Sequence, residues 1–405
     1  MAEPARGGLR RESLLSTVTR QGGLVAKVVI VQPYIPAYRV PLFVELAKRL
    51  ASRGHRLVIA AGEPDRTQLQ RGDATHVRGV EEATLRTRSL HAGPLRVRFS
   101  SAAQVWKSAD AVIVELSASS LDSYRALASR GIRVGVWGHV GAYVKEDSWL
   151  VAMLKRWQVR HADHVLAYTD GGATTAVQLG ADPSNVTALN NTVDVRGLRR
   201  AVERQRTMPE ANARVSLGVG SGPVFAMIGG LDESKRIDLV VAALDHLWQT
   251  SSNVQLVVGG HGELEDLFAP ARLRGQVKML GYVDDERKAT IARVATALLN
   301  PGRVGLIAVE SMALGLPIVT TSGTRHAPEY EYLVPGVSAV EVPPIASELA
   351  TTMQRMTQDS EQMDGLRRAL SARASSFSIE AMAAAMDEAI EDLLTGDKAR
   401  RQQRS

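Results

Sequence analysis

Short apolar runs alternate along the chain with longer stretches in which apolar residues recur every three or four positions. In the first half, the Val- and Ile-rich runs are 27–32, 55–61, 110–115, 133–138 and 163–168. In the second half, they are 223–230, 253–260, 277–281, 296–301 and 316–321. Apolar runs of this kind, separated by amphipathic helices, predict parallel strands that helices cover on both faces. The pattern therefore predicts an α/β protein with two Rossmann-like halves.

A polar, charged and glycine-punctuated stretch interrupts the alternation between the two halves, as is typical of a linker. The N-terminus contains arginines but lacks the apolar region of a signal peptide. The expected units are a disordered leader (1–24), an N-terminal Rossmann-like domain on the acceptor side (25–195), an interdomain linker (196–222), a C-terminal Rossmann-like domain (223–377), an amphipathic helix (378–395) and a basic tail (396–405).

Composition narrows the class of protein. The 405 residues are 45% hydrophobic and 23% charged, which is typical of a globular chain with two domains. No apolar run approaches the ~20 residues of a membrane-spanning helix. The absence of cysteine excludes disulfides, thiolate metal sites and a cysteine nucleophile. A net charge of +6 suits nucleic acid, an anionic membrane or a phosphate-bearing substrate, but without a recognition motif a nucleic-acid partner is not expected.

Unusual segments follow strands in both halves, where ligands of open parallel sheets bind. They are 32–39 and 137–143 in the first half, and 229–236, 259–265, 300–310 and 323–333 in the second. A cleft between the two sheet edges would be lined by glycine turns and by Lys235, Arg236, Arg39, Arg303, His139 and His326. Helix N-termini that point into such a cleft bind phosphate through free N–H groups.

The segment 300–310 has the pattern of an anion-binding turn. Gly302 and Gly305 would let the backbone approach an anion, and a helix from about Leu306 would direct its N–H groups at it. Glu310, one turn further on, could accept hydrogen bonds from a ribose diol. Each residue also has a purely structural interpretation. Glu310 could be a capping residue, His139 a satisfied core histidine, Lys235 and Arg236 a solvated helix start, and His326 and Glu329 loop stabilisers.

Taken in order, these segments resemble the GT-B glycosyltransferases, and within them the large retaining family 4, over about residues 26–395. The similar motifs are Gly229, Leu231 and Lys235 of a Gly-Arg-Leu…Lys segment, the turn 259–264, the interdomain peptide Asn191–Asp194, and Glu310 followed by "ALGLPIV". The resemblance implies the GT-B fold: two Rossmann-like domains that face each other across a cleft, with a C-terminal helix that returns to the first domain.

Two positions depart from the family pattern. Gly230 stands where the family has an arginine that grips the donor diphosphate, and Gly302 stands where it has a glutamate that touches the transferred sugar. The same loop resembles a subgroup of bacterial envelope-sugar transferases that is poor in glutamate. The resemblance still implies ribose binding by Glu310. It leaves open whether Arg236, Arg303 or Arg39 replaces the missing arginine.

The resemblance also implies an activity and its residues. The expected activity is transfer of a sugar from a nucleotide donor to a glycan or lipid-linked acceptor, with retention, in cell-envelope or polysaccharide biosynthesis. The expected location is the cytoplasm, with the inner face of the membrane as a further option. Lys235 and His139 are the expected catalytic residues. The expected donor-binding residues are Gly229, Gly230, Arg236, Gly260, Gly262, Gly302, Arg303, Val304, Gly305, Leu306 and Glu310. No Asp-x-Asp is present, so neither a metal nor a further cofactor is expected.

Two other functions remain open at this point. A GT-B-fold sugar epimerase would use Glu310, Glu329, His139 and His326 as acids and bases. A non-catalytic relative that only binds a nucleotide sugar would account for Gly230 and Gly302.

The stretch 147–164 could form a further contact. It places Trp149, Met153 and Trp157 four residues apart among basic residues. Such a helix could rest peripherally on an anionic membrane. Its amphipathic pattern favours packing on the sheet with a basic outer face, and the two interpretations are compatible.

Overall fold

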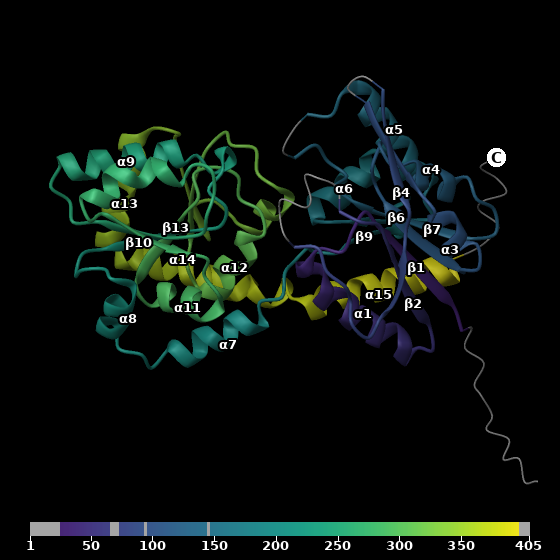
Figure 1. Ribbon diagram of the computed structural model, residues 1–405, viewed down its shortest axis with the longest axis horizontal. Coiled ribbons are helices and arrows are strands. Elements are labelled where there is room, and N and C mark those ends of the chain that lie inside the picture. The colour runs from purple at the N-terminus through teal and green to yellow at the C-terminus, as the bar shows by residue number, and fades with distance from the viewer. Residues whose placement is uncertain (1–24, 65–72, 93–94, 144–145, 397–405) are drawn as a thin grey trace, which may run out of the picture.

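A computed structural model of the protein describes residues 25–64, 73–92, 95–143 and 146–396 (Figure 1). The expected leader, 1–24, lies outside these residues, and so does the expected basic tail apart from residue 396. The described chain forms two lobes side by side along the long axis, each built around a parallel sheet. The prediction of two Rossmann-like domains is therefore confirmed.

The N-terminal sheet has the strand order β3-β2-β1-β6-β7-β8-β9, with every pairing parallel. Its strands are β1 (Lys27–Gln32), β2 (Arg56–Ala61), β3 (Glu81–Thr84), β6 (Ala111–Glu115), β7 (Arg133–Gly138), β8 (His164–Ala167) and β9 (Val186–Ala188). An antiparallel hairpin of β4 (Thr87–Ala92) and β5 (Leu95–Ser100) lies outside the sheet, against the helix that follows β6. Helices must cover both faces of the sheet, because consecutive residues of β1 are fully buried.

Two helical layers provide this cover. One face packs against α1 (Val40–Ser52) and the C-terminal helix α15 (Ile379–Thr395). The other face packs against α3 (Ala102–Trp106), α4 (Leu121–Leu127), α5 (Trp149–His161) and α6 (Asp170–Gln178). In Figure 1, α15 runs from the C-terminal lobe back along α1. The expected return of the last helix to the first domain is thus observed.

The C-terminal sheet has the order β12-β11-β10-β13-β14-β15, again with every pairing parallel. Its strands are β10 (Val224–Ile228), β11 (Gln255–Gly259), β12 (Val277–Gly281), β13 (Ala295–Leu299), β14 (Ile318–Thr321) and β15 (Ala339–Val342). Its helices are α9 (Ile237–Gln249), α10 (Ala269–Leu273), α11 (Asp285–Val294), α12 (Ile307–Leu314), α13 (Ala346–Gln358) and α14 (Ser360–Arg373). The short 3-10 helices of the two lobes are η1 (Ala37–Arg39), η2 (Pro183–Asn185), η3 (Glu233–Lys235), η4 (Glu265–Phe268), η5 (Pro328–Tyr332) and η6 (Ala374–Ser376).

Residues 196–222, expected to be a linker, instead carry two helices, α7 (Arg196–Gln205) and α8 (Glu210–Leu217). Leu198 and Leu217 are buried in the same cluster as α11 and α12, so both helices belong to the C-terminal lobe. Most of the remaining positions of α7 and α8 are polar and open to solvent, which explains why the composition resembles that of a linker.

The chain crosses between the lobes twice, and the two crossings are bonded to each other. The hydroxyl of Thr192, on the outward crossing, donates a hydrogen bond of 2.9 Å to the carbonyl oxygen of Phe377, on the return. The ring of Phe377 stacks on Tyr332 at a centroid distance of 4.0 Å. Both crossings therefore lie at one junction.

Candidate active site

The carboxyl edge of the C-terminal sheet brings together the loops after β10 and β11. The Gly229 amide donates to the Gly259 carbonyl at 2.9 Å, and the Leu231 amide donates to the His261 carbonyl at 3.0 Å. A Cβ on Gly260 would lie 1.9 Å from the Gly229 carbonyl oxygen, and one on Gly262 would lie 2.3 Å from that of Leu231. Side chains are thus excluded at both positions, because the two loops touch through their backbones.

The loop after β13 touches the loop after β10 in the same way. The Arg303 amide donates to the Ser234 carbonyl at 2.6 Å. A Cβ on Gly302 would lie 2.0 Å from that carbonyl oxygen and 2.7 Å from the Cα of Lys235. Any side chain at position 302 would therefore displace the loop that carries Lys235. The glycine that departs from the family pattern is required by this packing.

Lys235 ends η3, and its ammonium group is held at the loop after β13. Its Nζ donates a hydrogen bond of 2.9 Å to the carbonyl oxygen of Arg303. Removal from water lowers the pKa of Lys235, and the nearby positive charge of Arg303 lowers it further, while Asp232 acts in the opposite sense. Lys235 and Arg303 therefore lie together at this edge of the sheet.

The structure distinguishes the three arginines that could stand in for the one missing at position 230. Arg236 forms an ion pair with Asp238 at 3.0 Å, and its side chain extends over the surface of α9. Arg39 is only 2% exposed and donates to the Tyr168 hydroxyl at 3.1 Å in the N-terminal lobe. Arg303 is half-buried, and its backbone carbonyl accepts the hydrogen bond from Lys235. Of the three arginines, Arg303 is the one whose backbone contacts the Lys235 ammonium group.

Val304, Gly305 and Leu306 lead from this cluster into α12, whose first turn carries Glu310. The Glu310 carboxylate accepts a hydrogen bond of 2.8 Å from Nζ of Lys288, on the neighbouring helix α11. The pair is half-buried and engages one carboxylate oxygen, and within the described part of the chain no hydrogen bond to the other oxygen is seen. The sequence analysis did not identify Lys288, because nothing in the pattern of α11 distinguishes an inward lysine from a solvated one.

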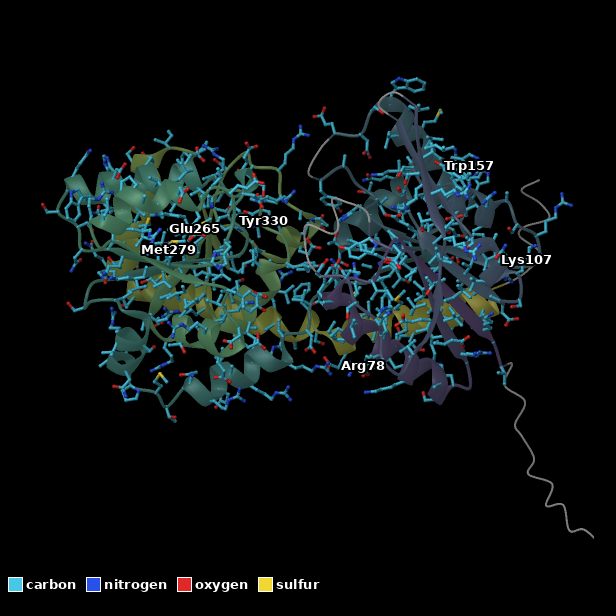
Figure 2. The ribbon with its side chains drawn as sticks, in the orientation of Figure 1. Arg78, Lys107, Trp157, Glu265, Met279 and Tyr330 are labelled. Atoms are coloured by element: carbon cyan, nitrogen blue, oxygen red, sulfur yellow. The ribbon has the colours of Figure 1, made fainter. Side chains whose placement is uncertain are left out.

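His326 lies beside the same loop. Its Nδ1 accepts a hydrogen bond of 3.1 Å from the Val304 amide, and the next residue, Ala327, donates its amide to the Val304 carbonyl at 2.9 Å. The imidazole contacts the tilted ring of Tyr330 at a centroid distance of 3.8 Å, and Figure 2 shows Tyr330 on the side of the C-terminal lobe nearer the other lobe. Desolvation, with a smaller effect of the Lys235 charge, lowers the pKa of His326 to about 4.

His139 follows β7 on the N-terminal side. Its ring contacts are with Tyr168 at 4.4 Å and Tyr143 at 6.0 Å. One edge of the ring remains open to solvent, but the surrounding protein, helped by the charges of Lys155 and Arg39, lowers the pKa of His139 to about 4. The structure thus places His139 in an aromatic cluster of the N-terminal lobe, separate from the Lys235 cluster.

A buried carboxylate joins the two lobes between these clusters. Glu329 is only 4% exposed and accepts a hydrogen bond from the side-chain amide of Asn191. Desolvation raises the pKa of Glu329. Two further bonds cross nearby: the Gly171 amide donates to Glu331 at 2.9 Å, and Arg325 donates to Glu146 at 2.6 Å. Glu329 therefore bonds the segment after β14 to the crossing that carries Asn191, a contact between lobes that the sequence analysis did not predict.

Comparison with known proteins identifies the family. The family model "Glycosyltransferase Family 4" matches residues 42–196, and the model "Glycosyl transferases group 1" matches residues 210–377. Each match falls on one of the two lobes, and the sheets have the order described above. The chain belongs to the GT-B glycosyltransferases.

Relatives of this glycosyltransferase match over limited stretches. A phosphatidyl-myo-inositol mannosyltransferase of Mycobacterium tuberculosis is 32% identical over 106 residues, which is 25% of this chain and 28% of that protein. A glycogen synthase of the same species is 23% identical over 193 residues, 44% of each chain. The chain thus spans less than half the length of these two curated relatives.

Solved structures match over nearly the whole glycosyltransferase. Anabaena Alr3699/HepE, solved in complex with UDP, has a TM-score of 0.64 at 16% identity and covers 91% of this chain and 100% of its own. A glycosyltransferase of Rickettsia africae has a TM-score of 0.66 at 14% identity, with 93% and 100% covered. At these identities the likeness shows the shared fold.

The first prediction concerns Gly302. Replacing it with alanine should lower the free energy of unfolding by about 1–3 kcal/mol, because the new methyl group forces the Ser234 carbonyl aside. It should also weaken nucleotide binding. Chemical denaturation and calorimetric titration with UDP would measure both. Gly365→Ala is the matched control, because a Cβ there meets nothing within 4 Å and alanine favours the helix. Equal behaviour of the two variants would contradict the packing argument.

The second prediction concerns the stability of the fold at acid pH. His139 and His326 have pKa values of about 4 in the folded glycosyltransferase against 6.5 ordinarily, so in this range the unfolded chain binds protons that the native state does not. The free energy of unfolding should therefore fall as the pH decreases from 6.5 toward 4. Urea denaturation near pH 7 and about pH 5 should show a smaller loss for the double variant His139→Asn/His326→Asn. The control is His246→Asn, on the exposed side of α9. If the double variant loses as much stability between the two pH values as the wild type, the two histidines are not the source of the pH dependence.

Proposed function

We propose that this glycosyltransferase moves a sugar from a nucleoside diphosphate donor to a glycan or lipid-linked acceptor in cell-envelope or polysaccharide biosynthesis. The observation that carries the proposal is the convergence of Lys235 and Arg303 on loops where only glycine fits, next to α12 and Glu310. Two cations beside a helix N-terminus suit a diphosphate. The complexes of Anabaena HepE with UDP and UDP-glucose support a nucleotide donor.

In this proposal the donor binds along the edge of the C-terminal sheet. The diphosphate lies against the glycine turns at 229–230 and 260–262 and the backbone of 304–306, and Lys235 and Arg303 neutralise its charge. The free oxygen of Glu310 accepts a hydrogen bond from a ribose hydroxyl, while Lys288 holds the other oxygen and orients the carboxylate. The sugar then projects toward the N-terminal lobe.

The proposed reaction proceeds with retention. The bond between C1 of the sugar and the phosphate oxygen breaks, and the acceptor oxygen bonds to C1 on the same face. The acceptor proton passes to the departing phosphate oxygen. Charge grows on the diphosphate as the bond breaks, so Lys235 and Arg303 stabilise the transition state more than the bound donor. His139, as a neutral imidazole, would position a hydroxyl near the reacting carbon, and the transfer would need no resident metal.

The third prediction tests these roles. Nucleoside diphosphate release should require an acceptor, should persist in EDTA, and should drop about 10²–10³-fold in kcat for Lys235→Ala. Arg303→Ala should also lower kcat, whereas Arg236→Ala should retain most of it, because Arg236 is engaged by Asp238. Glu310→Ala should mainly raise KM for the donor, since ribose contacts are equal in ground and transition states. Donor binding without transfer to any acceptor would instead favour a non-catalytic relative, and equal losses for the two arginines would contradict the assignment of Arg303.

We also propose that α5 rests on an anionic membrane surface, where lipid-linked acceptors would be found. Trp149 and Met153 are 77% and 50% exposed, and Arg156 and Arg160 are open to solvent on the same helix. Figure 2 shows Trp157 on the part of the N-terminal lobe away from the C-terminal lobe. Among the described residues, no helix has the length and apolarity needed to cross a bilayer, so the proposed contact is peripheral.

The fourth prediction addresses this contact. The protein should sediment with vesicles of phosphatidylglycerol and phosphatidylcholine but not with phosphatidylcholine alone, because basic residues flank the exposed apolar ones. The double variant Trp149→Ser/Met153→Ser should lose most of this binding. Trp248→Ser is the matched control, since Trp248 is 49% exposed on α9 of the other lobe. Binding that survives the double variant, or that is lost equally in the control, would rule out α5 as the contact.

A further inference from the structure

The transferred sugar needs a protein group to read it, and position 302 cannot supply one. A Cβ there would meet the Ser234 carbonyl oxygen at 2.0 Å, and the carbonyl carbon of Lys235 at 2.6 Å. Both contacts are with backbone, which cannot swing aside as a side chain would. The space that a glutamate would need at this position, as in the family pattern, is occupied by the turn that carries Lys235.

His326 is fixed on the other side of the same loop. Its Nδ1 is an acceptor for the Val304 amide at 3.1 Å. An imidazole nitrogen that accepts a hydrogen bond carries no proton, so in the neutral ring the proton resides on Nε2. The backbone of Val304 therefore selects the tautomer, and the bond from Ala327 to the Val304 carbonyl keeps the ring in register with the loop.

The Nε2–H group has no acceptor among the residues that the structure describes. Buried donors in native proteins are nearly always paired, so an unpaired one near a binding loop calls for a partner. The Arg303–Val304 peptide links the ring to the ammonium group that would face the diphosphate, because its carbonyl accepts from Lys235 and its N–H donates to His326. The preceding residue, Arg325, reaches across to Glu146 of the N-terminal lobe. His326 thus lies where the chain passes from the diphosphate loops toward the facing lobe.

We propose that His326 reads the transferred sugar by donating a hydrogen bond from Nε2 to one of its oxygens. This inference rests on the proposed function. In this role His326, from the segment after β14, takes the place of the side chain that is excluded at position 302. The chemistry differs from that of a carboxylate. A neutral N–H group can donate a hydrogen bond to a hydroxyl, a carbonyl or a carboxylate oxygen. A glutamate would require a hydroxyl and would repel a carboxylate.

Two substitutions distinguish sugar binding by His326 from its structural role as the hydrogen-bond acceptor for the Val304 amide. His326→Asn places an amide oxygen near the position of Nδ1, where it can accept from Val304, but it has no group that reaches the position of Nε2. His326→Gln extends an amide N–H to about that position. Tyr330→Phe is the matched control, because it preserves the tilted ring beside His326 and removes only a hydroxyl.

The fifth prediction compares Kd values for UDP, UDP-glucose, GDP and GDP-mannose by isothermal titration calorimetry. In the wild type, the Kd of the nucleotide sugar should differ from the Kd of the corresponding nucleoside diphosphate. In His326→Asn the nucleotide sugar should bind about 2–10-fold more weakly, as expected for one lost hydrogen bond, with the diphosphate within twofold of wild type. His326→Gln should recover part of the difference, and Tyr330→Phe should match wild type.

Two outcomes would overturn the inference. An unchanged ratio of the two Kd values in His326→Asn would show that His326 does not touch the sugar. An equal weakening of diphosphate and nucleotide sugar would show that it only supports the loop. If the wild type binds none of the four ligands, the proposed donor site fails as a whole, and that result is distinct from either of these.

Discussion

The backbone contact between the loops after β10 and β13 determines the geometry of the candidate active site. Parallel strands that are neighbours in a sheet release their loops at the same edge, and here the loops are close enough for the Arg303 amide to bond the Ser234 carbonyl. That contact excludes a side chain at position 302, positions the Lys235 ammonium at the Arg303 carbonyl, and sets the start of α12. His326 is attached to the same loop through Val304. One contact therefore places together the groups that we propose to bind the phosphates and the sugar.

The two lobes meet through buried polar groups, in contrast to the apolar clusters inside each lobe. A carboxylate such as that of Glu329 is costly to bury, and the Asn191 amide and the charge of Arg39 offset part of this cost. A junction of this kind requires the partners to be in register, because a small displacement leaves a buried polar group without its hydrogen bond. It thus specifies how the donor side faces the acceptor side.

Much of the fold could be predicted from the sequence, because buried parallel strands are continuous apolar runs and the helices between them are amphipathic. The hairpin β4–β5 was not foreseen, because the strands were predicted from continuous apolar runs, whereas residues 95–100 (LRVRFS) alternate apolar and polar positions. Glycine turns and the order of motifs led to the prediction that the loops around Lys235 and Glu310 bind the donor, and that role stays a prediction. The choice among the three candidate arginines, the contact of Lys288 with Glu310 and the His326 tautomer could not be predicted, because each depends on a partner far away in the sequence. Which of three arginines approaches Lys235 is a property of the folded backbone.

The position of α15 has a consequence for synthesis of the chain on the ribosome. The core of the N-terminal lobe includes Ile379, Met386 and Ile390, so the surface that α15 covers on α1 and on β7, β8 and β9 stays open until the chain has emerged as far as residue 395. The C-terminal lobe has all its strands before that point and can be complete first. The domain that is made first is thus the last to close, and its exposed apolar face would be a natural target for chaperones during translation.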